Sequence, residues 1–464
     1  MLENTSLNSA SPIAQTASQR DRPYPIPPST SRQLFKSSSL IILTFVVAFY
    51  PRVLAAMKVP SAVNFLHFAC TLLLLIFTLP RIRSRLQVHL STRLLYGLYS
   101  VLLIISASAF WNNAGIINIV LDFLLLSEPF ILLLAIVGLR MNQNSIQRFH
   151  WVLIISGIIN VLFAYVQYFV LKLDTVGGPD AIKGVFLNQG AGHHVGGAVA
   201  LTSAIYMFNQ PVIRSLGVKI LLAVAFIPQT FPMSDSKQVI VVFLGSMMIL
   251  TLTKFKKIFE ILKYIMLTLG AIAAVYWIIV NLFPALGYWL NVTLLIDSFA
   301  AKFSVFHIIN RYFTTPIHWL IGLGPGHTIG RLGWLIPDYG TILRPLGVTT
   351  TPVTAAIFAE NDTNPLTNAV TGSSMFSLTF SWAGIWGDLG LLGMGAYLYL
   401  WFITWQKICV DSLSKFLVLN MLIFGGIFSW LEEPGYMLFV VSIIGLQWQT
   451  RLKRAEHSAE INAL

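Results

Sequence analysis

The sequence predicts an all-α polytopic membrane protein with about twelve transmembrane helices and one large extracytoplasmic loop. Of its 464 residues, 56% are hydrophobic and only 10% are charged, whereas an average soluble domain is roughly 45–50% apolar and about 25% charged. So few polar groups cannot cover a water-facing surface, which excludes an ordinary soluble enzyme. The apolar residues form continuous runs rather than alternating ones, which disfavours a transmembrane β-barrel.

Apolar runs close to the length that spans a bilayer follow one another along the chain. They cover, approximately, residues 37–57, 62–80, 94–111, 115–139, 151–171, 193–208, 217–233, 238–253, 264–284, 388–406, 416–431 and 435–449. These runs divide the chain into a disordered polar tail (1–36), transmembrane helices (37–284), a large loop that should fold (285–387), further helices (388–449) and a second tail (450–464).

The positions of the basic residues predict which way the helices run. With the N-terminus in the cytoplasm, most of the 30 Lys and Arg residues fall in cytoplasmic segments, and each internal cytoplasmic loop carries at least two. Basic residues gather on that side of a bilayer. We therefore read the net charge of +12 as a sign of membrane orientation and expect no nucleic-acid partner. Both termini are then cytoplasmic, and the large loop faces the other side.

The sequence predicts no cofactor and no metal site. Cys70 and Cys409 are the two cysteines of the chain, too few for a thiol metal site or a disulfide framework. His193 and His194 are adjacent, so they do not point the same way from a helix. No G-x-x-x-x-G-K-[ST] loop occurs, which disfavours an ATP-driven machine.

A first candidate site lies on the outer side between the seventh and eighth apolar runs. Lys237 breaks the basic-side pattern there, and Ser236 precedes it. A lysine at this place can extend from the interface to water without any function. It can also contact an anion, assisted by the N–H groups at the start of the following helix.

A second candidate lies in the large loop. Arg311 and His307 are one helical turn apart, and Gly322, Gly324 and Gly326 follow in a tight Gly-Pro turn. The planar guanidinium of an arginine suits phosphate oxygens. The alternative is an amphipathic surface helix that ends in a turn.

Acidic residues complete the set of candidates. Asp388 is expected to begin the tenth helix, either as its N-cap or as a general base at the outer rim. Asp122 and Glu128 lie within the fourth apolar run, where we expect them to make interhelical hydrogen bonds. Glu432 and Glu433, on the turn before the last helix, are expected to be solvated.

Four short motifs stand in a definite order on the outer side. The matching residues are Gly184, Phe186 and Asn188 for G-x-F-x-N-P-N; Ser236-Lys237-Gln238 for S-R-[GS]; Arg311, Pro316, Gly322, Gly324 and Gly326 for an Arg before a Pro stretch and G-x-G-x-G; and Asp388, Gly390, Leu391, Leu392 and Gly393 for [ED]-x-G-L-L-G. Over roughly residues 150–410 the chain thus resembles the O-antigen ligase and polymerase superfamily of bacterial polysaccharide assembly. Gln189, Gly190 and the lysine at 237 depart from its patterns.

The resemblance implies a metal-independent inverting glycosyltransferase in the bacterial inner membrane, with its active face in the periplasm. The donor would be a glycan on polyprenyl pyrophosphate and the acceptor a second glycan, with polysaccharide assembly proteins as possible partners. It assigns catalytic roles to Arg311, Lys237, Asp388 and His327, and substrate binding to Asn188, Ser236, Arg331, His307, Gly324 and Gly326. The proton acceptor stays open among Asp388, His307, His318 and His327.

Three alternatives to a polymerase remain open: a ligase, a transporter and a non-catalytic scaffold. Ligases of the superfamily usually carry a His-Asn pair about nine residues before the acidic residue, and this chain has Thr379-Phe380 there. That difference favours a polymerase over a ligase. A transporter of lipid-linked oligosaccharides would suit the helices equally well, but the two halves of the sequence show no repeat of the kind transporters commonly carry. A non-catalytic membrane scaffold is a third reading.

Overall fold

The computed structural model describes residues 37–187, 191–210, 215–253, 292–363 and 377–463, with single helical positions between 259 and 281. These residues form helices and turns, with no strand among them, so the all-α class is confirmed. Five helical spans are long and apolar enough to cross a bilayer: Ser61–Arg81, Arg85–Trp111, Ile116–Gly138, Gln143–Val170 and Leu216–Met233. The predicted total of about twelve is not confirmed. Several other apolar helices are shorter, and most of the run 264–284 lies outside the described residues.

The helical bundle contains both long helices and short turns that join them. Its elements are α2 (Ser37–Phe49), α3 (Pro51–Ala56), η1 (Ser61–Phe65), α4 (Leu66–Thr78), η2 (Leu79–Arg81), α5 (Arg85–Trp111), α6 (Ile116–Gly138), α7 (Gln143–Tyr165), η3 (Val166–Val170), α9 (Gly192–Asn209), α10 (Leu216–Pro228), η5 (Gln229–Met233), α11 (Lys237–Leu252), α20 (Ser381–Ile403), η9 (Thr404–Ile408), α21 (Ser412–Phe424), η10 (Trp430–Glu432) and α22 (Pro434–Ala463).

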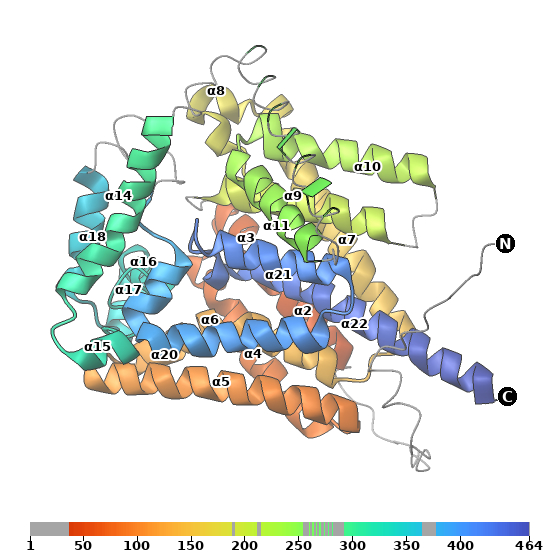
Figure 1. Ribbon diagram of the computed structural model, residues 1–464, viewed down its shortest axis with the longest axis horizontal. Coiled ribbons are helices and arrows are strands. Elements are labelled where there is room, and N and C mark those ends of the chain that lie inside the picture. The colour runs from red at the N-terminus through yellow and green to blue at the C-terminus, as the bar shows by residue number, and fades with distance from the viewer. Residues whose placement is uncertain are drawn as a thin grey trace.

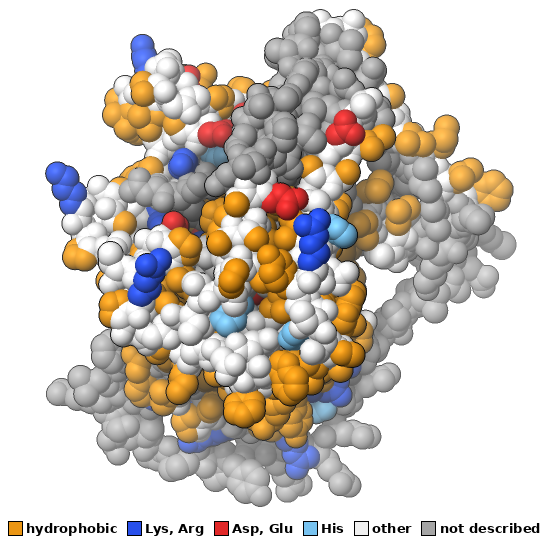
Figure 2. Space-filling view, turned by 90° about the vertical axis from the view of Figure 1, so that its left-hand side faces the viewer, with side chains coloured by type: hydrophobic (Ala, Val, Ile, Leu, Met, Phe, Trp, Pro, Cys, Tyr) orange, Lys and Arg blue, Asp and Glu red, His pale blue; other side chains and the backbone are white. Residues whose placement is uncertain are grey.

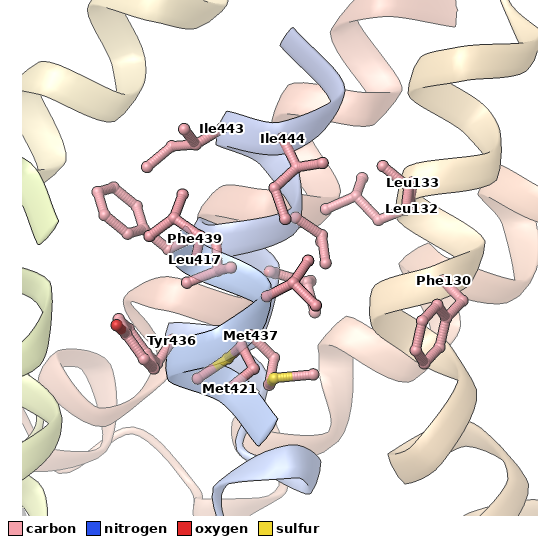
Figure 3. Packing of buried hydrophobic residues seen from close by; sticks show 14 of the residues in the cluster. Phe130, Leu132, Leu133, Leu417, Met421, Tyr436, Met437, Phe439, Ile443 and Ile444 are labelled. Atoms are coloured by element: carbon pink, nitrogen blue, oxygen red, sulfur yellow. The ribbon is translucent and has the colours of Figure 1, made fainter. Parts of the chain in front are cut away.

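The core of the bundle surrounds α6 and α22. From Leu124 to Gly138, every residue of α6 is buried, as a helix that is apolar on all sides requires. Figure 3 shows Phe130, Leu132 and Leu133 of α6 on one side and side chains of α22, such as Phe439 and Ile443, on the other. Leu417 and Met421 of α21 join the same cluster. This packing fixes the frame on which the ends of the bundle are built.

A second group of helices gathers at one end of the bundle, opposite the end where the C-terminus of the chain lies (Figure 1). They are α14 (Val292–Arg311), α15 (Pro316–Ile321), α16 (Arg331–Asp338), α17 (Gly340–Leu343), η7 (Arg344–Leu346) and α18 (Pro352–Thr363). We call this the loop end. All of these helices belong to the stretch 285–387, whose described part is therefore folded. The short helices α8 (Leu173–Gly177) and η4 (Pro179–Ala181) lie between η3 and α9.

The opposite end, which we call the basic end, is held by caps and polar surface contacts. Asn142 caps α7 by accepting a hydrogen bond from the Ser145 N–H at 2.8 Å, and Asp411 caps α21 in the same way. Arg140 pairs with Glu456 of α22 across 3.2 Å. These contacts bring together the segments that the charge pattern assigns to one side of the membrane.

The predicted start of the tenth helix is wrong. We expected a helix to begin at residue 388, but α20 begins at Ser381, so Asp388 lies inside it and cannot be its N-cap. The helix instead breaks at Gly390, whose backbone has φ +64° and ψ −162°. Because the acidic residue and the glycines of the motif surround this break, they resemble a helix start in the sequence.

Candidate functional site

The break in α20 is closed by the glycine turn that follows α15. A broken helix leaves carbonyl groups without their helical partners, and these need donors from elsewhere. The Gly387 carbonyl accepts from the Leu323 N–H at 2.8 Å, and the Asp388 carbonyl accepts from the Gly324 N–H at 3.1 Å. The Ser108 hydroxyl of α5 donates to the Asp388 carbonyl at 2.9 Å. The third and fourth motifs, more than sixty residues apart, are therefore one structural unit.

The Asp388 carboxylate holds the same turn from its side chain. Its Oδ1 accepts from the backbone N–H of Thr328 at 2.7 Å and from the Thr328 hydroxyl at 2.6 Å, and its Oδ2 accepts from the Gly326 N–H at 3.1 Å. Only 2% of Asp388 is exposed. The contacts fit a residue that positions the glycine turn, rather than one that receives a proton from a substrate in solution.

His327 is fixed in the same way. Its Nδ1 is 3.0 Å from the Leu323 carbonyl and its Nε2 is 2.8 Å from the Thr349 hydroxyl. Burial lowers the pKa of His327 below its usual value. Since a carbonyl can only accept, Nδ1 carries the proton of a neutral ring and Nε2 accepts. Both nitrogens are thus occupied within the turn.

The turn before α22 departs most from the sequence prediction. Glu432 and Glu433, expected to be solvated, are 2% and 3% exposed. Glu433 pairs with the Arg331 guanidinium, and Glu432 Oε2 accepts from the Arg331 N–H at 2.6 Å. A charged residue on a short turn is normally solvated, but here the start of α16 covers the turn and supplies its donors.

Glu432 shares its buried surroundings with other carboxylates. Its Oε1 has no hydrogen-bond partner within the described residues. A methyl group on Gly330 would lie 2.5 Å from Asp388 Oδ2 and 3.9 Å from Glu432 Oε2, so the two acids flank this glycine. Burial raises the pKa of Glu432 to about 8, with the Asp388 charge adding to the rise and Arg331 opposing it. Glu432 accepts from one donor, the Arg331 N–H, whereas three donors stabilise the Asp388 anion, so of the two acids Glu432 is the easier to protonate.

The first and second motifs meet around α9. The Ser236 hydroxyl donates to the His193 carbonyl at 3.0 Å, and an added Cβ on Gly192 would lie 2.2 Å from the Phe186 carbonyl. Lys237 is partly exposed and pairs with Asp235 across 3.1 Å. Asn188, which the resemblance assigns to substrate binding, lies outside the described residues.

A small cavity lies between Phe186 of the first motif and Arg331, which follows the third. Its volume is about 30 Å³, enough for one or two water molecules. Arg52, His67 and Glu433 also line it. Two arginines thus face one space. The sequence singled out Arg331, whereas Arg52 gave no signal beyond being a basic residue on the outer side.

Tyr339 lines another wall of this cavity, and Glu128 holds its wall residue His67 from behind. The Tyr339 hydroxyl is 3.1 Å from Arg52 and accepts from Asn64 at 2.9 Å. Glu128 accepts from the Thr71 hydroxyl at 2.8 Å and is equally close to His67. The interhelical hydrogen bonds predicted for Glu128 are therefore present.

Two further candidates lie on the surface of the loop end. His307 and Arg311 are both exposed on α14. Figure 2 shows this end of the molecule, where charged side chains stand singly among hydrophobic ones. His318 is buried and takes part in a capping box with Thr315 at the start of α15. Among the described residues, the structure offers no group of three or more His, Cys, Asp or Glu that could hold a metal ion.

No protein-family model matches this chain, and no curated protein matches it.

Proposed function

We propose that this protein is a membrane glycosyltransferase that joins polyprenyl-pyrophosphate-linked oligosaccharides into a surface polysaccharide on the extracytoplasmic side. The observation that carries the proposal is that the third and fourth motifs contact each other, while residues of the first and second motifs contact the start of α9. The glycine turn and Asp388 form one unit. Phe186 and Ser236 flank α9, and Phe186 also lines a cavity together with Arg331. The family resemblance supplies the reaction, and these contacts support it.

The reaction needs a cation for the leaving group. A hydroxyl of the acceptor sugar attacks the anomeric carbon of the donor, the bond from that carbon to the pyrophosphate oxygen breaks, and polyprenyl pyrophosphate leaves. Fixed positive groups aimed at the developing charge typically contribute a factor of about 10²–10³. Arg311 is exposed and Lys237 partly so, and both can reach a lipid-linked substrate from the side. Arg331 and Arg52 are the deeper cations.

The reaction also needs a proton acceptor, and burial distinguishes the four candidates. Asp388, His327 and His318 are buried, and each is engaged in local hydrogen bonds. His307 is exposed, one turn before Arg311 on the same helix. We assign the acceptor role to His307 and a positioning role to Asp388 and His327. A hydroxyl held between His307 and Arg311 would lose its proton to the ring as the bond to the anomeric carbon forms.

The test is a glycan profile of a deletion strain that resolves surface polymer and lipid-linked intermediates. Single repeat units in place of a long ladder are expected for a polymerase. Long chains that remain on the lipid carrier would mean a ligase instead. An unchanged profile would overturn both and leave a transporter of another cargo.

Complementation of that strain tests the residues. Arg311→Ala and His307→Ala should each lower polymer formation by about 10²-fold. Arg344→Ala is the matched control, because Arg344 is an exposed arginine of the same loop end that belongs to no motif, and it should complement fully. Full complementation by Arg311→Ala, with the protein present in the membrane, would refute the site assignment.

A further inference from the structure

The basic end carries a hollow that the proposed reaction does not use. Its volume is about 710 Å³, within the range of ligand sites in proteins. Residues of α5, the Arg83 before it and Tyr399 of α20 line it: Arg83, Arg85, Val88, His89, Thr92, Arg93, Tyr96 and Tyr399. Four of these eight side chains are basic. We call it the basic hollow.

The spacing of these residues puts three basic side chains in one row. Arg85, His89 and Arg93 are four residues apart, so they lie above one another on a single face of α5. Val88, Thr92 and Tyr96 form the neighbouring row. Gly97 lets α20 come close, since an added Cβ there would meet Leu400 at 2.5 Å and the Tyr399 ring at 3.4 Å. The close crossing is what brings Tyr399 to the wall of the hollow.

The basic groups of the hollow have no acidic partner within the described residues. The ion pairs found there involve other cations, such as Arg140 at the same end. None of the described residues that line the hollow is acidic either. A row of cations without a counter-charge favours an anionic ligand.

The length of α5 places the hollow at the depth of lipid headgroups. Its 27 residues extend roughly 40 Å, and the hydrocarbon core of a bilayer is about 30 Å thick. With the Trp111 end at the far boundary of the core, Arg85 and His89 lie in the headgroup layer and Arg93 at its edge. Tyr96 lies a little deeper, inside the edge of the core, and a tyrosine there can extend its hydroxyl toward the interface that tyrosines prefer; Tyr399 is exposed beside it on α20.

Apolar side chains continue from the hollow along the same helices. Tyr99 and Leu103 of α5 and Leu398 and Phe402 of α20 are all exposed. They provide a surface for acyl chains directly beside the basic row. A free phosphate ion would use only the cations, whereas a phospholipid would use both parts.

We propose that the basic hollow is a binding site for an anionic glycerophospholipid, whose phosphate contacts Arg85 and Arg93 and whose chains lie along α5 and α20. Basic pockets between transmembrane helices commonly bind such headgroups. This site would hold a lipid of the surrounding bilayer, at the end of the bundle opposite the proposed glycosyl transfer. It is independent of that function.

The experiment compares lipids retained by the purified full-length protein from bilayers of equal phosphatidylcholine and phosphatidylglycerol, measured by native mass spectrometry. The wild type should retain phosphatidylglycerol preferentially. The double variant Arg85→Gln/Arg93→Gln should lower that retention about 30-fold, since each cation near a bilayer surface contributes about a fivefold factor. The control Arg140→Gln/Arg148→Gln removes the same charge from the same end outside the hollow and should change retention less than about twofold.

A third variant protects the test against misfolding of the double variant. Val88→Asp places a carboxylate in the hollow at a site that is already 42% exposed, and it should lower retention as strongly. Equal losses in the control and the double variant would overturn the proposal in favour of general surface charge. Retention unchanged in Val88→Asp, or displacement of the lipid by millimolar inorganic phosphate, would overturn it as well.

Discussion

The two ends of this bundle use the same residue types in opposite ways. At the loop end, Arg331 and Glu433 form an ion pair whose side chains are 13% and 4% exposed. At the basic end, Arg140 and Glu456 pair with side chains that are 69% and 33% exposed. The exposed pair is screened by water and contributes little, typically less than about 1 kcal/mol. The buried pair has been withdrawn from water, so each partner depends on the other.

The difference extends to what surrounds each pair. Around Arg331 and Glu433, backbone N–H groups and hydroxyls converge on the carboxylates of Glu432 and Asp388. Glu456 is reached by flexible side chains, those of Arg140 and Lys453. Buried charges held by fixed donors are costly to assemble, and their presence at the loop end agrees with our proposal that the reaction takes place there. The basic end is instead suited to a charged membrane surface.

The largest contrast should appear when the arginine of each pair is replaced. Arg331→Met leaves Glu433 buried without its cation, so the free energy of unfolding should fall by about 3–5 kcal/mol. Arg140→Met should cost less than about 1 kcal/mol, because water replaces the lost partner. Chemical unfolding in detergent micelles measures both. Equal effects would show that burial does not separate the two ends.

A glycine pair on α20 tests how firmly the loop end is fixed. Gly390→Ala should lower the unfolding free energy by about 3 kcal/mol, since its φ of +64° strains any other residue and the new Cβ would lie 2.5 Å from the Leu320 backbone. Gly395, further along the same helix, has nothing within 4 Å of an added Cβ. Gly395→Ala should therefore raise stability by about 0.5–1 kcal/mol. Thermal melting of both variants measures these opposite changes in stability. If Gly390→Ala melts like the wild type, the break in α20 is not needed for the stability of the loop end.

The helices could be read from the sequence better than the site could. The continuous apolar runs 94–111 and 115–139 predicted the helices now seen over 85–111 and 116–138, because the apolar pattern is local and composition alone carries it. The polar first nine residues of α5 gave no such signal. The glycine turn and Asp388 were also recognised, but as separate motifs. Their contact depends on how α15 packs against the break in α20, and no spacing encodes that.

The burial of Glu432 and Glu433 was missed for a related reason. Nothing near them in sequence announces it, since their partner Arg331 lies about a hundred residues earlier. A local pattern can identify a charged residue, whereas only the tertiary packing decides whether water reaches it. Arg52 and Tyr339, which share the cavity, were beyond the sequence analysis on the same ground.

A further contrast concerns the pH dependence of stability, and its sign should differ between the ends. Burial raises the pKa of Glu432 to about 8, well above the value of about 4.3 in an unfolded chain. Its stabilising contribution is therefore complete below about pH 4.3 and is lost as the pH rises through 8. For Glu456, burial alone would raise the pKa, but the hydrogen bond and charge of Lys453 together with Arg140 lower it overall. Its contribution is present at neutral pH and is lost as the pH falls below the unfolded value.

Replacing Glu432 or Glu456 by glutamine removes the pH dependence of stability that this residue causes. Glu432→Gln should flatten the decline in unfolding free energy between about pH 4.3 and 8, whereas Glu456→Gln should leave that range unchanged and alter only the acid limb. Both curves come from denaturant titrations at a series of pH values in the same detergent. If Glu432→Gln keeps the decline, the proton belongs to another buried acid of the loop end, and Asp122, whose Oδ2 also has no partner among the described residues, is the next to replace. If both variants change the same limb, the two ends titrate alike, and the contrast drawn from their burial fails.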